Sequence, residues 1–78
     1  MHEMIPLSLM GLGQTGVVEN VLGLPDQVHR LEELGLRGGV EIEMVQPGSP
    51  CIIRLSGHKL CFRPDEVMTI LVRPRASA

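Results

Sequence analysis

The sequence predicts a small, mainly β domain: an antiparallel β-barrel of about five short strands with one short α-helix. Three observations lead to this fold class. The chain has 78 residues, which is enough for one small domain. Its apolar residues fall into short runs that are rich in β-branched residues or alternate with period two, and glycine and proline separate these runs. Only one short segment has helical spacing. Closing the sheet into a barrel would hide its strand edges, and so short a chain has few other elements that could cover them.

The first strand follows the stretch GLGQTG, from Gly11 to Gly16. This stretch matches the G-x-G-x-x-G fingerprint of dinucleotide-binding loops, which requires a strand before it and a helix after it. The preceding IPLSLM is a poor strand, and the following VVENVL, residues 17–22, is rich in β-branched residues and predicts a strand. A full nucleotide-binding fold would also exceed the length of this chain. We therefore expect no bound nucleotide at this stretch.

The segment after this strand predicts one short α-helix. Asp26 is its expected N-cap, because the carboxylate can accept a hydrogen bond from a free amide of the first turn. Gly35 is expected to end the helix in the left-handed conformation of a Schellman cap, with Leu36 packed back on Leu31. The helix has one apolar face made by residues at three-residue spacing, namely Val28, Leu31 and Leu34.

The stretch VEIEMV, residues 40–45, predicts a strand with one solvent-facing side. Its core-facing side chains are expected to be Val40, Ile42 and Met44. Next, CIIRLSGHKLCF predicts a β-hairpin with Ser56-Gly57 as its two-residue turn. The resulting register pairs Leu55 with His58, Ile53 with Leu60, and Cys51 with Phe62. The core face of the hairpin is then Ile53, Leu55, Leu60 and Phe62. Arg54 and Lys59 lie together outside, and His58 is expected at the surface.

The ends of the chain complete this organisation. VMTILV, residues 67–72, is the last expected strand of a single domain over residues 1–72, and residues 73–78 are expected to be a flexible tail. The N-terminal MHEMIPLSLM has no basic segment and an interrupted apolar run, so it is neither a signal peptide nor a membrane span. A cytoplasmic location follows most simply, where Cys51 and Cys61 stay reduced. They fall on opposite faces of the hairpin, so no disulfide is expected.

The composition disfavours several classes of function. The formal net charge is −2 and Phe62 is the one aromatic residue, which disfavours nucleic-acid binding and gives no reason to expect an anionic membrane. Residues 1–50 carry two arginines against seven acidic residues, a balance of −5, whereas residues 51–78 carry five basic residues against two acidic ones, a balance of +3. This asymmetry would orient a partner unless folding brings the two halves together.

Few residues suggest chemistry. We find no nucleophile with a visible base and no G-x-x-x-x-G-K-[ST] loop, so we do not expect an enzyme, and no cofactor is required. His29, Glu32 and Glu33 lie at i, i+3 and i+4 of the helix and could approach Fe²⁺ or Zn²⁺ weakly, with His2 or Glu3 as further ligands. The alternative interpretation is a solvated helix face with an ion pair, and we assign no metal site from the sequence.

Four stretches in order resemble one family across nearly the whole chain. They are LSLMGLGQTG, RLEELGLRGGVEI, PGSPCIIRLSGHKLCFR and DEVMTILV, and together they are similar to ferrous iron transport protein A, the FeoA family. The resemblance implies an SH3-like barrel, similar to the C-terminal domain of metal-dependent repressors of the diphtheria toxin repressor type. In that family, Gly13 falls at the turn into the first long strand, and Gly11 and Gly16 give the turn room. Gly38-Gly39 and Cys61 depart from the usual Pro-Gly and small residue.

The resemblance implies a cytoplasmic accessory protein that binds the cytoplasmic part of the membrane transporter FeoB. The expected partner contact lies around the helix, at Leu24, Leu34, Leu36 and Arg37. A rival hypothesis is a transition-metal sensor that uses His2, His29, Glu32 and Glu33. The sequence leaves open whether the protein activates or inhibits the transporter and whether it forms a homo-oligomer. It gives no reason to expect direct insertion into a membrane.

Overall fold

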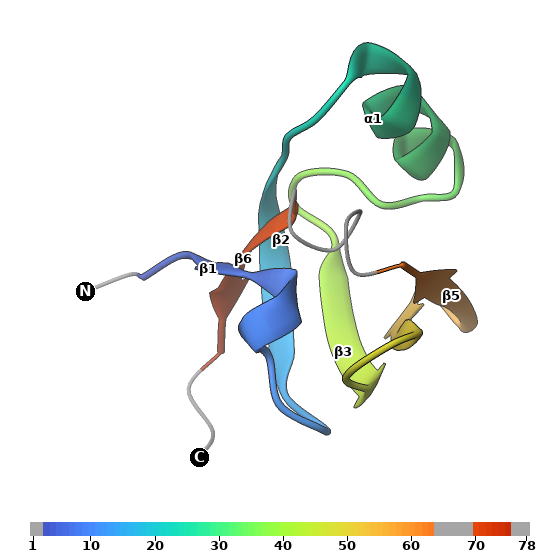
Figure 1. Ribbon diagram of the computed structural model, residues 1–78. Coiled ribbons are helices and arrows are strands. Elements are labelled where there is room, and N and C mark those ends of the chain that lie inside the picture. Colours follow the sequence, from blue (N-terminus) through green and yellow to red (C-terminus); the bar gives the residue numbers. More distant parts are fainter. Residues whose placement is uncertain (1–2, 64–69, 76–78) are drawn as a thin grey trace.

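The computed structural model describes residues 3–63 and 70–75. In chain order, this part contains β1 (Ile5–Pro6), the 3-10 helix η1 (Leu7–Leu9), β2 (Thr15–Val21), α1 (Pro25–Glu33), β3 (Glu41–Gln46), β4 (Cys51–Leu55), β5 (His58–Phe62) and β6 (Ile70–Pro74) (Figure 1). The strands form one sheet in the order β1-β6-β2-β3-β4-β5, with every neighbouring pair antiparallel. The mainly β, antiparallel fold with one short α-helix is confirmed. Within the described residues β1 and β5 remain sheet edges, so the sheet is barrel-like without being closed.

The sheet has one strand more than the five expected, and its last strand ends later than expected. The additional strand, β1, lies in the stretch that the sequence marks as a poor strand, and it pairs with β6 through Ile5 and Pro6. At the other end β6 reaches Pro74, with Arg73 opposite Val17. The tail therefore does not begin at residue 73, because sheet pairing continues through these positions. The remaining expectations for residues 67–69, for the tail at 76–78 and for the side chain of Phe62 concern parts outside the described residues.

The core is an aliphatic cluster with sulfur-containing side chains between the sheet, η1 and α1. Its buried members are Leu7, Met10, Val18, Leu31, Leu36, Ile42, Met44, Cys51, Ile53, Leu55, Ile70 and Val72. Val40 and Leu60 are partly buried against it. No polar or charged side chain of residues 3–63 and 70–75 is buried, so the interior of this described part carries no desolvated polar side chain. The core thus depends on apolar burial alone.

The two ends of α1 are capped in different ways. Its N-cap is Leu24, not the expected Asp26, because Pro25 occupies the first helical position with a backbone angle that suits helix entry. Asp26 instead lies in the first turn, where its charge interacts favourably with the positive end of the helix dipole. The Schellman cap is confirmed: Gly35 has φ of +100°, and the Leu36 N–H donates to the Leu31 carbonyl over 2.9 Å.

The glycines of GLGQTG serve different purposes. Gly13, at the turn into β2, has φ of +81°, and its N–H donates to the Met44 carbonyl over 2.7 Å. Gly16 lies within β2, where a Cβ would be 2.6 Å from Val72 Cγ1 and 2.9 Å from the Arg73 carbonyl oxygen. The expectation that Gly16 gives the turn room is therefore wrong. Its missing side chain lets β6 approach β2.

The expected hairpin register is confirmed at every pair from Cys51–Phe62 to Leu55–His58. Its turn has φ of 45° at Ser56 and 83° at Gly57, the positive values that a type I′ turn requires at both central residues. Three ion pairs then connect basic residues of the second part of the chain to acidic residues of the first part. They are Arg54 with Glu43 at 3.0 Å, Arg73 with Glu19 at 2.9 Å and Arg75 with Glu41 at 3.2 Å. Folding thus neutralises much of the charge asymmetry seen in the sequence.

Candidate partner-binding surface

With one exception, the exposed large apolar side chains of the described residues form two groups. The first group, called here the helix-rim leucines, consists of Leu22, Leu24 and Leu34. The second, called the turn-end group, consists of Leu9 at the end of η1 and Leu12 in the turn before β2, whereas Met4 is exposed separately just before β1. Figure 1 shows α1 beyond one end of the sheet and the turn before β2 at the opposite end. Single exposed leucines are ordinary on a protein surface, but several around one element mark a candidate contact area.

The helix-rim leucines flank α1 at both ends. Leu24 is the N-cap residue and Leu34 the C-cap residue, with 67% and 46% of their surfaces exposed. Both were expected from the sequence as partner contacts. Leu22 is 53% exposed and was not expected. An unbroken period-two pattern would place it on the same face as the buried Val18. The pairing of β2 with β6 shifts register just after Val18, which breaks this alternation.

Leu36 is not part of this surface. It was expected as a partner contact, but its exposed fraction is 0% because the Schellman cap folds the residue after Gly35 back over Leu31. The sequence predicts the cap correctly, but the cap buries Leu36, and the expectation that Leu36 is an accessible partner contact is wrong. Leu31 is buried as expected for the inner side of the helix.

The C-terminal end of α1 carries two further side-chain contacts. The Arg37 guanidinium donates from Nη2 to the Glu32 carbonyl oxygen over 3.0 Å and remains exposed. The His58 Nε2 lies 3.3 Å from the Leu34 carbonyl oxygen and contacts it from the hairpin. The Glu32 carbonyl also accepts the Gly35 N–H of the cap, whereas the Leu34 carbonyl is one that the helix itself leaves without a partner at its last turn. Arg37 therefore places a positive charge close to Leu34, at the negative end of the helix dipole.

The metal-ligand candidates of the sequence are brought together only in part. His29 Nε2 lies 3.2 Å from Glu33 Oε2 on the exposed face of α1, one turn apart. Glu32 and Glu3 are exposed, and His2 lies outside the described residues. Among residues 3–63 and 70–75, no three His, Cys, Asp or Glu side chains are grouped so that they could hold a metal ion. The structure thus gives a two-residue His–Glu pair on the helix.

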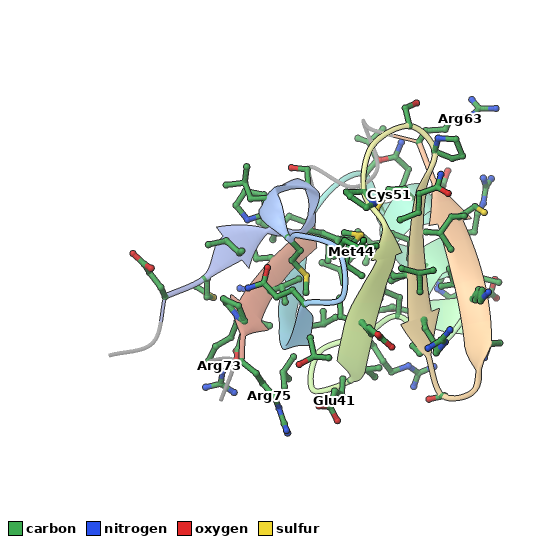
Figure 2. All side chains as sticks on the ribbon, turned by 90° about the horizontal axis from the view of Figure 1, so that it is seen from below. Glu41, Met44, Cys51, Arg63, Arg73 and Arg75 are labelled. Carbon is green, nitrogen blue, oxygen red and sulfur yellow. The ribbon has the colours of Figure 1, made fainter. Side chains whose placement is uncertain are left out.

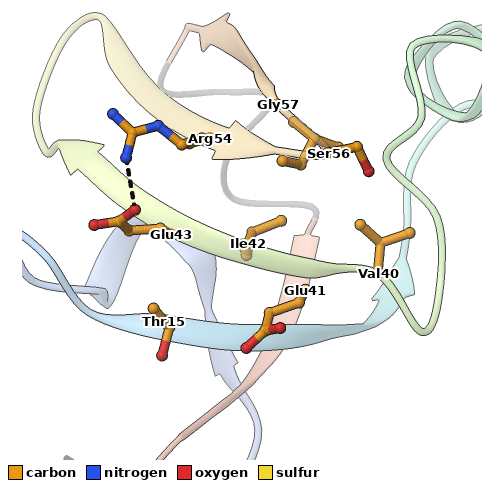
Figure 3. Close-up of a pocket in the computed structure, with 9 residues that line it drawn as sticks. Thr15, Val40, Glu41, Ile42, Glu43, Arg54, Ser56 and Gly57 are labelled. Carbon is orange, nitrogen blue, oxygen red and sulfur yellow. Dashed lines mark hydrogen bonds and ion pairs between the residues drawn. The ribbon is translucent and has the colours of Figure 1, made fainter.

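An open groove of about 510 Å³ crosses the outer side of the sheet beside the hairpin turn (Figure 3). Its lining comes from Thr15 of β2, from residues 40–43, and from residues 54–57. The pairing of β3 with β4 begins at Glu43 opposite Arg54, and the groove extends beyond this pair towards Ser56 and Gly57. Both carboxylates of the groove lie against arginines, Glu43 against Arg54 and Glu41 against Arg75. Neither carboxylate is therefore placed as a ready base or ligand.

The two cysteines differ in environment. Cys51 is buried, and its thiol donates to Met44 Sδ over 3.6 Å (Figure 2). Burial raises the pKa of the Cys51 thiol, with the nearby Cys61 as a smaller cause. Cys61 is exposed on the opposite face, and both thiols are free, as expected. A raised pKa keeps Cys51 in the unreactive thiol form, so it behaves as a small core residue.

No helix in the described part of the chain is long and apolar enough to cross a membrane. Around α1, the described residues offer the helix-rim leucines, the exposed Arg37 guanidinium and the His58 imidazole that contacts the helix end.

The family model and the solved structures that match this chain point to the same protein family. The FeoA domain family matches residues 5–74. The solved structure of an iron uptake regulatory protein, FeoA, is 29% identical, covers 94% of this chain and 100% of its own, and superposes with a TM-score of 0.86. The FeoA of Stenotrophomonas maltophilia, complexed with zinc, is 31% identical over 92% of this chain and 96% of its own, with a TM-score of 0.78. It is described as a prokaryotic SH3 domain protein and a candidate activating factor of bacterial ferrous iron transport. The expected SH3-like fold is thereby confirmed.

A more distant structure shares the fold alone. The T. acidophilum IdeR protein is 18% identical over 92% of this chain and 34% of its own, with a TM-score of 0.86. The present chain thus corresponds to about one third of that longer protein. No curated protein sequence matches the chain.

Proposed function

The chain belongs to the FeoA domain family, and on this premise we propose that it is an accessory protein of ferrous iron uptake that binds the cytoplasmic part of the FeoB transporter. It acts by binding and without a catalytic step of its own, and its place is the cytoplasmic side of the membrane. The observation that carries the proposal is the exposure of the helix-rim leucines at both ends of α1. On the inner side of the helix Leu31 is buried in the core together with Leu36, which lies just past the helix end, while Val28 is half-buried.

Folding leaves much of the apolar surface of the helix-rim leucines in water. Fully burying a leucine side chain stabilises a protein or complex by about 1.5–3 kcal/mol. Leu24 is mostly exposed, so a partner that covers it recovers much of this amount. Truncation of such a contact typically costs more than about 1 kcal/mol of binding free energy, and 1.4 kcal/mol corresponds to tenfold in Kd. One helix-rim leucine should therefore change the affinity measurably.

Arg37 supplies the polar part of the surface. Its guanidinium contacts a main-chain carbonyl and keeps its full charge beside Leu34. A rim charge of this kind contributes to association rate and to partner selection more than to affinity. Charge reversal at this position should therefore slow association with an acidic partner surface.

The test measures binding of the purified protein to the cytoplasmic domain of FeoB by titration calorimetry or biolayer interferometry, with and without guanine nucleotide. Leu24→Ala and Leu34→Ala should each raise Kd about tenfold, and Arg37→Glu should lower the association rate. Leu12→Ala is the control, because Leu12 is at least as exposed as Leu24 and Leu34 but belongs to the segment between η1 and β2 and not to α1 or its flanks. If Leu24→Ala, Leu34→Ala and Arg37→Glu all bind as the wild type does, the proposed surface is wrong. A selective loss with Leu12→Ala would move the contact to the turn-end group.

A second candidate function is transition-metal sensing on α1. The observation that favours it is the His29–Glu33 pair, whose Nε2 and Oε2 atoms lie 3.2 Å apart on one exposed helix face. A related protein is complexed with zinc. In an anaerobic titration with Fe²⁺ or Zn²⁺, saturable NMR shifts confined to α1 that disappear in His29→Ala would support it. Uniform weak broadening across the protein would count against it.

A further inference from the structure

The tip of the β4–β5 hairpin and the C-terminal end of α1 are in contact. His58 is the first residue of β5, and its Nε2 lies 3.3 Å from the Leu34 carbonyl oxygen. A carbonyl oxygen can only accept a hydrogen bond, so Nε2 carries the proton and donates. Leu34 is the C-cap residue of α1, and its carbonyl is one of those that the helix leaves without an internal partner. The contact therefore satisfies a group at the helix end from a different part of the chain.

Packing reinforces this contact. A Cβ added at Gly35 would lie 3.7 Å from Leu55 Cδ1 and 4.0 Å from His58 Cε1, so the cap faces both side chains across a gap that one methyl group would fill. Leu55 and His58 are also the pair that closes the hairpin turn. Leu55 is buried in the core and His58 is exposed, so the hairpin meets the helix cap with one apolar and one polar contact.

The other end of the helix has no comparable restraint. In the described part of the chain no side-chain hydrogen bond caps α1 at its N-terminal end, where Leu24 is the N-cap. The helix buries Leu31 beneath it, followed by Leu36 just past its end. Within the described residues, these two leucines and the side-chain hydrogen bond from His58 hold α1 against the sheet, whereas the Arg37 side chain contacts α1 from the segment that directly follows the helix. Leu34, whose carbonyl receives that bond, is itself one of the helix-rim leucines.

We propose that His58 is a positioning residue of the partner surface: by donating to the Leu34 carbonyl it fixes the C-terminal end of α1, and with it the Leu34 side chain, in the orientation that the partner binds. The proposal rests on the proposed function, because it assigns His58 a part in docking to FeoB. His58 itself need not touch the partner. A helix end that moves in the free protein must be ordered upon binding, and that ordering reduces affinity. A held helix end avoids this loss.

The test has two readouts on the full chain. The first is amide hydrogen exchange of the isolated protein at Gly35 and Leu36, whose N–H groups form the cap hydrogen bonds. The second is Kd for the cytoplasmic domain of FeoB. In His58→Ala, exchange at these two amides should accelerate about three- to tenfold and Kd should rise by a similar factor, as expected for loss of one hydrogen bond. Exchange in the centre of β2 and β3 should stay as in the wild type.

Two variants distinguish positioning from general destabilisation. His58→Gln retains an N–H donor at similar reach and should restore both slow exchange and tight binding. Lys59→Ala, the matched control, alters the next residue of the same hairpin, an exposed side chain on the opposite face, and should change neither readout. Unchanged exchange and unchanged Kd in His58→Ala would overturn the proposal.

The outcome also separates this inference from the proposed function. Faster cap exchange with unchanged Kd in His58→Ala, while Leu34→Ala still weakens binding, overturns the positioning role and leaves the proposed surface standing. If none of Leu24→Ala, Leu34→Ala and His58→Ala weakens binding, both the surface and the positioning role are wrong. Weaker binding with unchanged cap exchange also contradicts positioning, because His58 would then contact the partner directly.

Discussion

Gly16→Ala is expected to destabilise the protein although its backbone is ordinary for a strand. Gly16 lies in β2 and its φ is not in the left-handed region, so alanine is conformationally acceptable there. The added Cβ would meet Val72 Cγ1 at 2.6 Å and the Arg73 carbonyl oxygen at 2.9 Å. Carbon atoms in good contact are about 3.5–4.0 Å apart. One of these neighbours is main chain, so a rotamer change cannot relieve the overlap, and β6 must move away from β2.

The magnitude follows from two opposing effects. Replacing glycine by alanine at a compatible site stabilises by about 0.4–1 kcal/mol through the unfolded state. Overpacking by one methyl group costs about 1–3 kcal/mol. The overlap with a main-chain oxygen cannot be relieved by a rotamer change, so we take a cost of about 2–2.5 kcal/mol, and after the opposing gain the free energy of unfolding should fall by about 1–2 kcal/mol. For a domain of this size that lowers Tm by about 4–16 °C.

Gly11→Ala is the matched control within the same stretch. No atom lies within 4 Å of a Cβ at Gly11, and its φ is not positive, so the variant should be neutral or slightly stabilising. Gly13→Ala has space but places alanine at φ of +81°, which costs about 1–2 kcal/mol, and Gly13→Asn should recover part of this loss. Thermal and urea unfolding of the four variants would check the ranking. Equal stability of Gly11→Ala and Gly16→Ala would refute the close-approach argument.

Two further predictions concern the core. Leu36→Ala should reduce the free energy of unfolding by about 2–5 kcal/mol, because Leu36 is fully buried. Leu24→Ala alters an exposed side chain and should change it by less than about 0.5 kcal/mol. Urea unfolding of both variants would check this, and equal losses would contradict the burial assigned to Leu36. Burial raises the pKa of the Cys51 thiol in the folded state, so as pH rises this thiol ionises first in the unfolded chain. Its contribution to the free energy of unfolding is therefore fully present below the ordinary thiol pKa and is lost as pH rises through the folded pKa. When the pH is raised from neutral to about 10, the urea concentration at the unfolding midpoint should therefore decrease in the wild type, and it should decrease less in Cys51→Ala. At neutral pH a thiol reagent should modify Cys61 rapidly and Cys51 only upon unfolding.

Local patterns made the hairpin and the helix end predictable. In the β4–β5 hairpin, a two-residue turn fixes the register, and the register fixes which side chains face the core. At the end of α1, one glycine before a leucine predicts a cap whose hydrogen bonds span only a few residues. Both devices depend on neighbours in the sequence. They were therefore accessible without knowledge of tertiary contacts.

Apart from the N-cap of α1 and the burial of Leu36, which are local, the errors concern contacts between segments far apart in the chain. The closeness of Gly16 to Val72 depends on how β6 approaches β2, which no local pattern encodes. β1 becomes a strand only because β6 offers an edge to Ile5 and Pro6. Leu22 becomes exposed because the pairing shifts at a bulge in β2. The exposed leucines at the ends of α1 were partly foreseen, whereas the contact of His58 with the helix required the structure.

The distribution of charge explains why the helix rim is the better candidate for selecting a partner. The opposite charges of the two parts of the chain meet within the molecule, since Arg54, Arg73 and Arg75 each lie against a carboxylate of the first part. Those pairs leave little net field on that side of the sheet to guide an encounter. Arg37, in contrast, contacts a main-chain carbonyl and keeps its charge uncompensated by that contact, directly beside an exposed leucine. A partner that offers an acidic group next to an apolar pocket would satisfy both features at once. Raising the salt concentration should therefore slow association of the wild type more than that of Arg37→Glu. Equal salt dependence of the two proteins would show that Arg37 does not face the partner.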